Sequence, residues 1–449
     1  MSVGGYQAYA EYKPTGADWL TSAPAGWSVF DGKRIFESCR EPALSSDEQL
    51  AASQKFGVVP QSLMMELNDA KVMLALKGTS SFRHVEKNDY VISLRSFEGG
   101  IEYSAYAGCV SPAYTVLRPT KPIAVGFYKH LFKSRPYISA LQATTDSLRD
   151  GKAISYEQFG AIPLILPPVP EQTQIAAFLD HETAKIDRLI EKQQALISLL
   201  KEKRQAVISH AVTKGLNPHA PLKDSGIEWL GQVPAHWSIK PLKYLMSLTS
   251  GGTPSKDNVE YWEGAVPWAS SKDLKSDELF DTQDHITQKA IDRGAAELVP
   301  PGSILTVVRG MILLHTFPIT VTRVPMAINQ DLKAIQPTAG ISADFLAWLL
   351  RGSSDIVLST TDEAGHGTKV LRMESWLAIQ VPIPPLEEQA LIVTKIVKRL
   401  GQLDELTEDA HRAVTLLQER RTALISAAVT GKIDVRHWQP PGGAFTATN

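Results

Sequence analysis

The stretch Lys13-Pro-Thr-Gly-Ala-Asp-Trp-Leu-Thr-Ser-Ala-Pro-Ala-Gly-Trp-Ser-Val29 returns 210 positions later as Lys223-Asp-Ser-Gly-Ile-Glu-Trp-Leu-Gly-Gln-Val-Pro-Ala-His-Trp-Ser-Ile239. Both copies keep two tryptophans and a Pro-Ala pair in register. A second stretch, Leu166-Pro-Pro-Val-Pro-Glu-Gln172, returns 217 positions later as Ile383-Pro-Pro-Leu-Glu-Glu-Gln389, and its register continues without a gap to Ala211-Val-Thr213 against Ala428-Val-Thr430. A repeat of this length indicates a duplicated architecture.

The segments between the repeats have diverged. Residues of about 30 to 155 and about 240 to 370 match only faintly, and the shift from 210 to 217 makes the second segment about seven residues longer. The tryptophan element precedes each variable segment and the Pro-Pro element follows it, so the repeat is cyclic. This order predicts a closed, pseudo-symmetric arrangement in which two similar modules each recognise something different.

Composition places the chain among ordinary globular proteins. It has 449 residues, of which 43% are hydrophobic and 21% charged, enough for two to four domains with cores of their own. The first residues lack the charged and apolar regions of a signal peptide, and the apolar runs are interrupted by charges, so we expect a cytoplasmic protein. Cys39 and Cys109 have no CxxC spacing, which argues against a zinc site and a disulfide framework.

Charge gives only a local hint of a nucleic-acid partner. The formal net charge is -2, but the segment from Lys55 to Asp150 holds twelve Lys and Arg against eight Asp and Glu. Such a balance permits a surface that faces phosphates, and a solvated face of mixed charge is the commoner explanation.

Each Pro-Pro element opens a long amphipathic segment. Apolar residues recur at three- and four-residue steps from Glu171 and again from Glu387, and Gly215 and Gly431 lie near the two ends. Proline suits a helix entrance, and spacing near seven over about forty residues favours a coiled coil. We therefore expect the two helices to pair as an antiparallel coiled coil with a pseudo-twofold axis and to act as a spacer. Two independent core helices are the alternative.

These motifs resemble those of the DNA-specificity (S) subunits of type I restriction-modification enzymes. The resemblance covers the whole chain through Trp-Leu-x-x-x-Pro-x-x-Trp at 19–27 and 229–237, Leu/Ile-Pro-Pro-x-x-Glu-Gln at 166–172 and 383–389, and Ser250-Gly-Gly-Thr-Pro-Ser255. Two departures stand out: Pro170 takes the place of Glu387, and the first half has no counterpart of the Ser-Gly-Gly-Thr-Pro motif. The contacts of the first half are therefore the harder to assign.

The resemblance implies double-stranded DNA as a partner, with two target recognition domains that each read one half of an asymmetric, split sequence. It also implies that the helices fix the gap and dock two modification (M) subunits, which methylate adenine with S-adenosylmethionine, and that restriction (R) subunits use ATP and Mg. This chain would hold no cofactor, no metal and no catalytic residue. In agreement, it contains neither Asn-Pro-Pro-Tyr/Phe nor Gly-x4-Gly-Lys-Ser/Thr.

The expected fold class is α/β (α+β), with two mixed domains joined by the long helices. We place the first recognition domain at 1–161, the first helix at 162–215, the second domain at 216–378, the second helix at 379–437 and a flexible tail at 438–449. Trp19, Trp27, Trp229 and Trp237 are expected to pack each domain against a helix, and the other tryptophans of the second domain to lie in its core.

Candidate DNA contacts in the first domain are polar residues after an expected strand at 72–76. They are Lys77, Thr79, Ser80, Arg83 and His84. A plain hairpin turn explains this loop equally well. A second group is Lys129, Lys133 and Arg135, for which a solvated helix end is the alternative.

Candidate contacts in the second domain begin with a turn whose amides and hydroxyls could cradle a phosphate. Its members are Ser250, Gly251, Gly252, Thr253, Ser255 and Lys256. A structural turn is the competing interpretation. Arg309 follows an apolar strand, and His366, Thr368 and Lys369 form a second cationic segment. We expect these two segments to vary with the DNA target more than the turn at 250–256, which suits a phosphate contact or a scaffold. His366 has no neighbours at metal-ligand spacing and is interpreted as a loop residue.

Three functions compete at this point. The first is a non-catalytic scaffold that reads DNA and recruits methyltransferase and nuclease subunits. The second is an enzyme with an unrecognised site, and the third is a coiled-coil adaptor that binds only proteins. The near-neutral charge predicts weak DNA binding by the chain alone, with most phosphate contacts supplied by M subunits.

Overall fold

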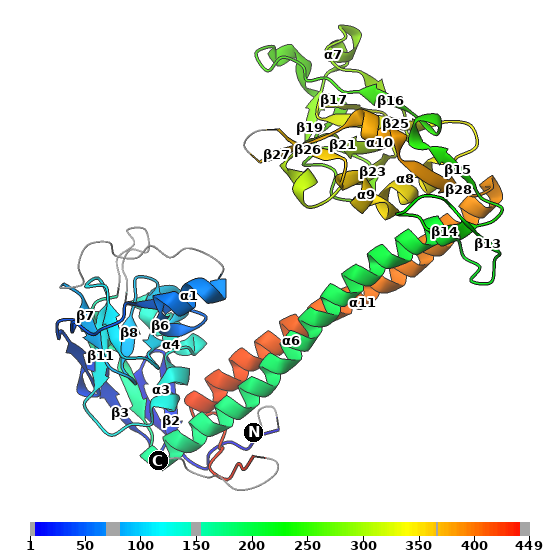
Figure 1. Ribbon diagram of the computed structural model, residues 1–449. Coiled ribbons are helices and arrows are strands. Elements are labelled where there is room, and N and C mark those ends of the chain that lie inside the picture. The colour runs from blue at the N-terminus through cyan, green and yellow to red at the C-terminus, as the bar shows by residue number, and fades with distance from the viewer. Residues whose placement is uncertain (1–4, 69–80, 145–153, 365–366, 441–449) are drawn as a thin grey trace. The chain divides into compact units, whose positions relative to one another are not determined.

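The chain folds into two units. The computed structural model describes residues 5–68, 81–144, 154–364 and 367–440. Unit 1 comprises Met1–Gln194 and Arg412–Asn449, and unit 2 comprises Ala195–His411. Both units share the long helices α6 (Val169–Lys214) and α11 (Leu386–Val429), because each unit boundary falls inside a helix (Figure 1).

Unit 1 is built on a small antiparallel sheet with the order β4-β11-β8-β9. Its strands are β1 (Tyr12–Ala17), β2 (Leu20–Pro24), β3 (Ser28–Asp31), β4 (Phe36–Cys39), β5 (Leu50–Ser53), β6 (Gly57–Pro60), β7 (Arg83–Val85), β8 (Tyr90–Ile92), β9 (Glu102–Tyr103), β10 (Gly108–Val110), β11 (Thr115–Pro119) and β12 (Pro163–Leu166). Its short helices are α1 (Gln61–Asn68), α2 (Ser96–Gly99), α3 (Val125–Leu131), α4 (Arg135–Ala143) and α5 (Tyr156–Ala161).

Aromatic side chains fill the core of unit 1. Phe36 of β4 is fully buried and lies 5.1 Å from Tyr128 of α3 and 5.6 Å from Tyr90 of β8 between ring centroids, with edge-on geometry. Edge-to-face pairs add roughly 0.5–1.5 kcal/mol each beyond the area they bury. The cluster also takes in Ile175 and Phe178 of α6, so the core of unit 1 extends onto the long helix.

The larger sheets of unit 2 are two mixed sheets and one three-stranded antiparallel sheet. Their orders are β16-β25-β21-β23-β18, β19-β17-β24-β20 and β22-β27-β26. The strands are β13 (Leu222–Asp224), β14 (Gln232–Pro234), β15 (Ser238–Pro241), β16 (Met246–Ser250), β17 (Trp262–Ala269), β18 (Glu278–Leu279), β19 (Asp284–Ile286), β20 (Leu298–Val299), β21 (Ile304–Val307), β22 (Arg309–Gly310), β23 (Ile319–Thr322), β24 (Met326–Ile328), β25 (Leu332–Pro337), β26 (Thr361–Ala364), β27 (Thr368–Leu371) and β28 (Gln380–Ile383). The helices are α7 (Gln288–Asp292), α8 (Ala343–Gly352), α9 (Ser354–Leu358) and α10 (Met373–Ala378).

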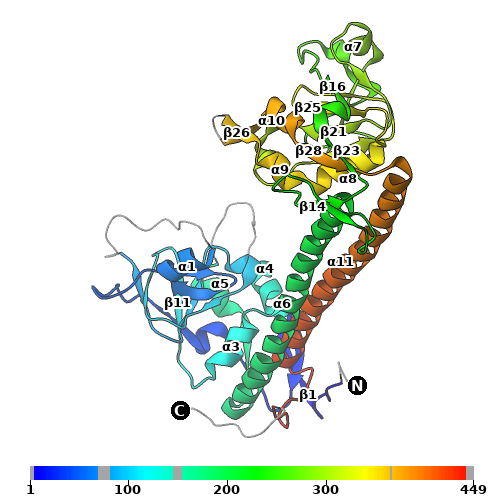
Figure 2. The ribbon, with the colours of Figure 1, turned by 45° about the vertical axis from the view of Figure 1, so that its right-hand side comes forward.

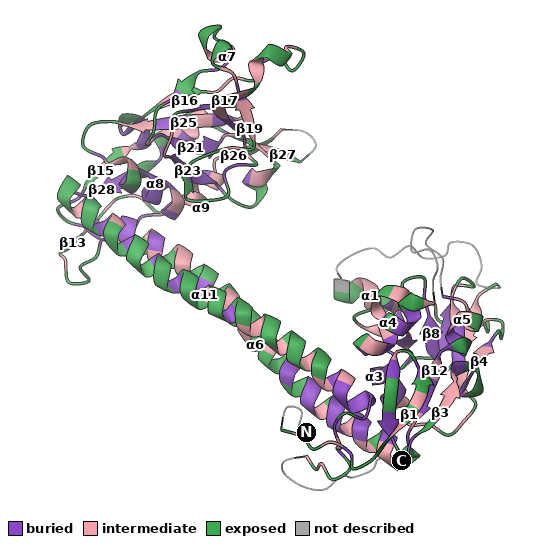
Figure 3. Ribbon diagram, turned by 180° about the vertical axis from the view of Figure 1, so that it is seen from behind, coloured by how far each residue is buried: buried purple, intermediate pink, exposed green. Residues whose placement is uncertain are grey.

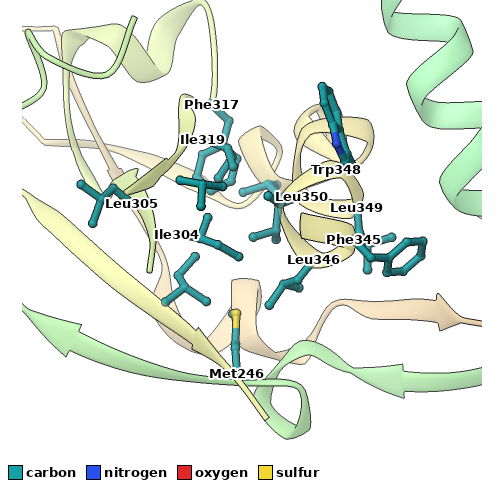
Figure 4. Close-up of a cluster of buried hydrophobic side chains, with 14 of the residues drawn as sticks. Met246, Ile304, Leu305, Phe317, Ile319, Phe345, Leu346, Trp348, Leu349 and Leu350 are labelled. Atoms are coloured by element: carbon teal, nitrogen blue, oxygen red, sulfur yellow. The ribbon is translucent and has the colours of Figure 1, made fainter. Parts of the chain in front are cut away.

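Helix α8 packs on the five-stranded sheet to form the core of unit 2. Figure 4 shows Leu346 and Leu350 of α8 on the side of the helix toward Ile304 of β21 and Ile319 of β23. All four are at most 5% exposed, and full burial of such a side chain stabilises the fold by roughly 1.5–3 kcal/mol. Ile392 and Ile396 of α11 belong to the same cluster, so this core also reaches a long helix.

The repeated sequence forms the same local structure in each unit. Strand β3 pairs with β12 in unit 1, and β15 pairs with β28 in unit 2, both antiparallel. Each pair joins the strand after the second tryptophan to the strand before the Pro-Pro element. We call the repeated motifs and these paired strands the frame. In each unit the frame brings together the two ends of the variable segment.

The long helices bury residues mainly where they pack on each unit, whereas the stretches 187–199 and 411–424 hold only exposed and half-buried residues (Figure 3). In unit 1 they are linked by Arg421 of α11 and Asp187 of α6, at 2.8 Å between Nε and Oδ1. In unit 2, Arg204 of α6 lies 2.5 Å from Asp404 of α11. In both views the start of α6 lies beside the end of α11 in unit 1 (Figures 1 and 2).

The structure agrees with the predicted mixture of strands and helices. Each long helix begins slightly before the expected Glu171 and Glu387, at Val169 and Leu386. In α6 this includes Pro170, which is tolerated in a first turn because its missing N–H costs no hydrogen bond there. The expected strand at 72–76 lies outside the described residues. In the part of the chain that the structure describes, no helix is both long and apolar enough to cross a membrane.

Candidate nucleic-acid interface

Two tryptophans tie the repeated frame to the long helices. The indole N–H of Trp27 donates to Glu171 Oε1 at 2.9 Å, and that of Trp237 donates to Glu388 Oε2 at 3.0 Å. Both indoles are 1% exposed. The second tryptophan of each motif therefore packs domain against helix, as predicted. Trp268, Trp348 and Trp376 are buried, whereas Trp262 is only half-buried.

The glutamine of each Pro-Pro element holds the variable segment in place. Gln172 accepts from the Ala124 amide at 2.9 Å and donates to Pro167 O at 2.7 Å. Gln389 accepts from the Ser342 amide at 2.9 Å and donates to Gly340 O and Pro384 O at 3.0 and 2.9 Å. Both side chains are 0% exposed. A buried amide must satisfy all its polar groups, so each glutamine specifies how the chain before α3 or α8 meets the long helix.

Two predicted contacts in unit 1, Arg83 and His84, lie on strand β7 and are largely committed to internal bonds. Arg83 donates to Tyr114 O at 2.7 Å, and burial lowers its pKa, with Arg40 lowering it further. His84 Nδ1 lies 2.8 Å from the buried Asp47. The other members of this predicted loop, Lys77, Thr79 and Ser80, lie outside the described residues.

An acidic cluster lies beside His84. Glu41, His84 and Glu86 each offer a possible metal-ligand atom within 4.8 Å of the others. The guanidinium of Arg118, however, lies 3.1 Å from Glu41 and 3.5 Å from Glu86, and its hydrogen bond to Asp89 raises its pKa. Arg118 already lies against both carboxylates, so the arrangement favours an ion-pair network over a metal site.

The three predicted cations on and between α3 and α4 differ in their availability. Lys129 is exposed, 5.9 Å from the Tyr103 ring centroid, and Arg135 is exposed at the first residue of α4. Lys133 instead donates to Gly99 O at 2.9 Å and to Glu102 at 2.5 Å. Lys129 and Arg135 can therefore meet a phosphate, whereas Lys133 would have to leave an internal ion pair.

Glu102 gives this part of unit 1 a measurable pH response. Burial raises its pKa from 4.5 to about 7, and the nearby Lys133 opposes the rise. A carboxyl with a raised folded-state pKa stabilises the fold below its unfolded pKa and loses that effect as the pH rises through about 7.

We expect Glu102→Gln to remove this loss, because glutamine cannot ionise but can still accept from Lys133. The melting temperature of the variant relative to the native chain should rise between about pH 5 and about pH 8, with exposed Glu98→Gln showing no such trend. Thermal unfolding followed at both pH values measures this, and parallel curves for Glu102→Gln and the native chain would contradict it.

The predicted turn from Ser250 to Lys256 is held rigidly by its surroundings. A Cβ on Gly251 would lie 2.0 Å from Asn329 O, so only glycine fits. Gly252 O accepts from the Trp268 indole at 3.0 Å, and Ser255 O accepts from the Trp262 indole at 3.1 Å. The hydroxyl of Ser250 accepts from Lys333, and that of Thr253 is bonded to Gln330. These contacts favour the structural role for the glycines and leave Lys256 exposed at the end of the turn.

Lys256 borders a hollow of about 740 Å³ that the sequence did not predict. Its lining includes Trp262 and Trp268 of β17, Lys272, and His285 of β19. Lys272 pairs with Asp284 at 2.7 Å and His285 with Asp281 at 2.8 Å. The sequence pattern predicts that both tryptophans lie in the core of the second domain. Pairing of β17 with β19 brings Trp262 and Trp268 close to His285.

Strand pairing also unites predicted residues that are far apart in the sequence. Arg309 of β22 lies opposite Val370 of β27, and Gly310 lies opposite Lys369. Arg309 is exposed, and Lys369 is half-buried with Nζ 3.2 Å from Glu363. Thr368 begins the same strand, and His366 lies outside the described residues. Arg309, Thr368 and Lys369 therefore belong to one small sheet.

Comparison with known families gives one family model that covers both the repeated frame and the variable segments. The family of the type I restriction modification DNA specificity domain matches residues 24–199 and 234–415. The chain belongs to this family. The two matches fall one on each copy of the repeat.

The DNA-specificity family includes curated relatives from bacteria and archaea. The specificity subunit of type I restriction enzyme EcoR124I/EcoR124II from Escherichia coli is 29% identical over 44% of this chain and 47% of the relative. That of MjaIX from Methanocaldococcus jannaschii is 26% identical over 42% and 43%. These alignments span about half the length of each relative. The MjaVIII specificity subunit of the same archaeon is 24% identical over 89% of this chain and 90% of its own.

Solved structures of this family share the fold. A chain from a type I R-M system, studied for its complex assembly and conformational transition, superposes with a TM-score of 0.68 at 16% identity, over 92% of this chain and 99% of that one. The HsdS subunit from Thermoanaerobacter tengcongensis superposes with a TM-score of 0.55 at 17% identity, over 95% and 100%.

Proposed function

We propose that this chain is the DNA sequence-specificity subunit of a type I restriction-modification complex and has no catalytic activity of its own. It reads an asymmetric, bipartite DNA target with one recognition domain per half-site, and it docks two modification subunits and the restriction subunits. The observation that carries the proposal is the family match to two separate segments, each enclosed by one copy of a repeated frame whose contents have diverged.

In this proposal the recognition domains are residues 1–161 and 216–378, and the spacers 162–215 and 379–437 each contain a short strand followed by a long helix, α6 or α11. The spacers form an antiparallel coiled coil with a pseudo-twofold axis. Two ion pairs support this, because Asp187 meets Arg421 while the later Arg204 meets the earlier Asp404. A spacer of this kind sets the gap between the half-sites. S-adenosylmethionine, ATP and Mg would be bound by the partner subunits.

The DNA-facing residues that the geometry favours are exposed cations on short elements. These cations are Lys129 and Arg135 in unit 1 and Lys256 and Arg309 in unit 2. The half-buried Thr368 and Lys369 lie on the sheet beside Arg309 and complete the proposed set. Arginine can bond guanine through two parallel hydrogen bonds, so Arg309 is the best base reader among them. The rigid turn at 250–256 suits a scaffold or phosphate contact, because its glycines are fixed by packing.

The deciding experiment exchanges the second variable segment. Residues of about 240 to 370 are replaced by the corresponding segment of a relative with a different target, and methylated sites are mapped in cells that also express the modification subunit. One half of the methylated motif should change and the other should remain. A change in both halves or in neither would overturn the proposal. Methyl transfer or cleavage by the purified chain alone would favour an enzyme instead.

Arg309→Ala should weaken methylation at the native target by about 10- to 100-fold, because a lost bidentate contact to a base costs roughly 1–3 kcal/mol. The matched control is Arg372→Ala, an exposed arginine just beyond β27 that is paired with Asp362 at 3.3 Å. Methylation rates on the native duplex and on duplexes with one base changed measure the effect. Equal losses on every duplex would assign Arg309 to a phosphate contact.

A further inference from the structure

Unit 2 has an open, basic hollow where the end of α6 lies near the start of α11 (Figure 1). Its volume is about 590 Å³, and its floor is formed by apolar side chains that include Val207, Ala211 and Ile396. Its rim carries the exposed cations Lys203, Lys395 and Arg399, together with His210. None of the described residues that line it is acidic. The hollow thus combines an apolar floor with a strongly positive rim.

The duplication supplies the corresponding place in unit 1, 217 positions away along each helix. Lys203 corresponds to Arg420, Lys395 to Phe178, and Arg399 to Glu182. Phe178 is 0% exposed and Glu182 9% exposed, although their counterparts in unit 2 are exposed. The same position on the frame is therefore covered in unit 1 and open in unit 2.

The two ends of the chain provide the cover in unit 1. The Tyr6 ring packs edge-on against Phe178 at 5.2 Å between centroids, and Trp438 packs on the same ring at 5.3 Å. Burial raises the pKa of Tyr6, and the negative charge of Glu182 raises it further. The cover therefore consists of aromatic side chains from two segments that approach from the termini.

Among the residues of unit 2 that the structure describes, no Phe, Tyr or Trp side chain lines the corresponding hollow. The chain there runs directly from Gly215 to β13, through a segment without Phe, Tyr or Trp. Leu216 and Pro218 of this segment line the hollow but leave it open. In unit 2, Lys203, Lys395 and Arg399 occupy the positions that Arg420, Phe178 and Glu182 occupy in unit 1. A complementary occupant must therefore bring negative charge along with an apolar group.

We propose that this hollow binds a segment of a partner protein in which an aromatic side chain is flanked by carboxylates. The aromatic ring takes the place that Tyr6 and Trp438 occupy in unit 1, and the carboxylates meet Lys203, Lys395 and Arg399. The proposal rests on the proposed function only in naming the modification and restriction subunits as the proteins that supply the segment.

The test places the photo-crosslinker p-benzoylphenylalanine at Val207 of the full-length chain, mixed with its purified modification and restriction subunits and target duplex. We expect a crosslink to an acidic, aromatic segment of one of those subunits. The matched position is Leu424, the counterpart in unit 1, where the crosslink should stay within the chain and fall on residues 5–12 or 431–438. A crosslink from position 207 to DNA, to a second copy or to this chain, or none at all while position 424 reacts, would overturn the proposal.

Charge variants test the complementarity. Lys203→Glu/Lys395→Glu should lower the crosslink yield about tenfold, since it reverses the rim charge. Lys201→Glu/Lys398→Glu makes the same change in net charge at exposed positions outside the lining and should leave the yield unchanged. Equal losses for both pairs would contradict a specific site. Target-specific methylation is measured in the same samples: methylation without the crosslink overturns only this inference, and the crosslink without methylation overturns only the proposed function.

Discussion

Gln389→Leu is expected to loosen unit 2 by about 3 kcal/mol, because the buried Gln389 side chain loses three hydrogen bonds of roughly 1 kcal/mol each. The bonds are those to Ser342, Gly340 and Pro384. Leucine has nearly the same volume, so the loss comes from hydrogen bonding rather than from a cavity. Since the second recognition domain would no longer be held at a fixed angle to the long helix, methylation of the native target should also fall.

Amide hydrogen exchange locates the effect. The Ser342 amide, which donates to Gln389, should exchange faster in Gln389→Leu, whereas the Ala124 amide should keep its protection. Gln172→Leu should give the opposite pattern, since Gln172 holds Ala124 in unit 1. The exposed Gln402→Leu on the same helix is the control and should change neither. Faster exchange throughout both units in either variant would contradict the separate anchoring of the two readers.

Leu199→Asp combined with Leu416→Asp is expected to abolish assembly with the modification subunits at micromolar concentrations. The two leucines occupy equivalent positions of the duplicated helices and are 59% and 64% exposed. Leu189 and Leu406 form a second equivalent pair, at 45% and 51% exposed. Single exposed leucines need no explanation, but the same exposure in both copies indicates a surface used twice. Loss of an apolar anchor at an interface typically costs 2 kcal/mol or more, which is roughly 30-fold in binding, and placing a carboxylate there adds to that cost, so each modification subunit loses its own docking position.

Gel filtration and ultracentrifugation of the chain with its modification subunit measure this loss. Leu391→Asp is the matched control: Leu391 is 63% exposed on α11, but its counterpart in the repeat is Gln174. Each single variant should remove one of the two modification subunits and leave the other bound. An intact complex in the double variant would place the docking surface elsewhere.

Local sequence features predicted the frame well. The two long helices follow from their amphipathic spacing and proline entrances, and the packing role of Trp27 and Trp237 follows from their fixed spacing in both copies. The candidate DNA contacts were harder to predict from the sequence. Lys133 has the sequence pattern of a surface lysine, yet it meets Glu102 from 31 positions away. No local pattern indicates such a partner, because the ion pair depends on how α4 packs against the chain before it.

By itself, the sequence determined that this protein is a duplicated frame around two diverged segments, because register between distant copies is a property of the chain alone. Tertiary structure decided which residues share a surface. Pairing of β22 with β27 brings Arg309 beside Lys369, and pairing of β17 with β19 builds the hollow at Lys256. Packing also decided that the termini cover Phe178 in unit 1 and leave its counterpart in unit 2 open. Contacts between residues far apart in the chain depend on the packed core, which short-range periodicity does not specify.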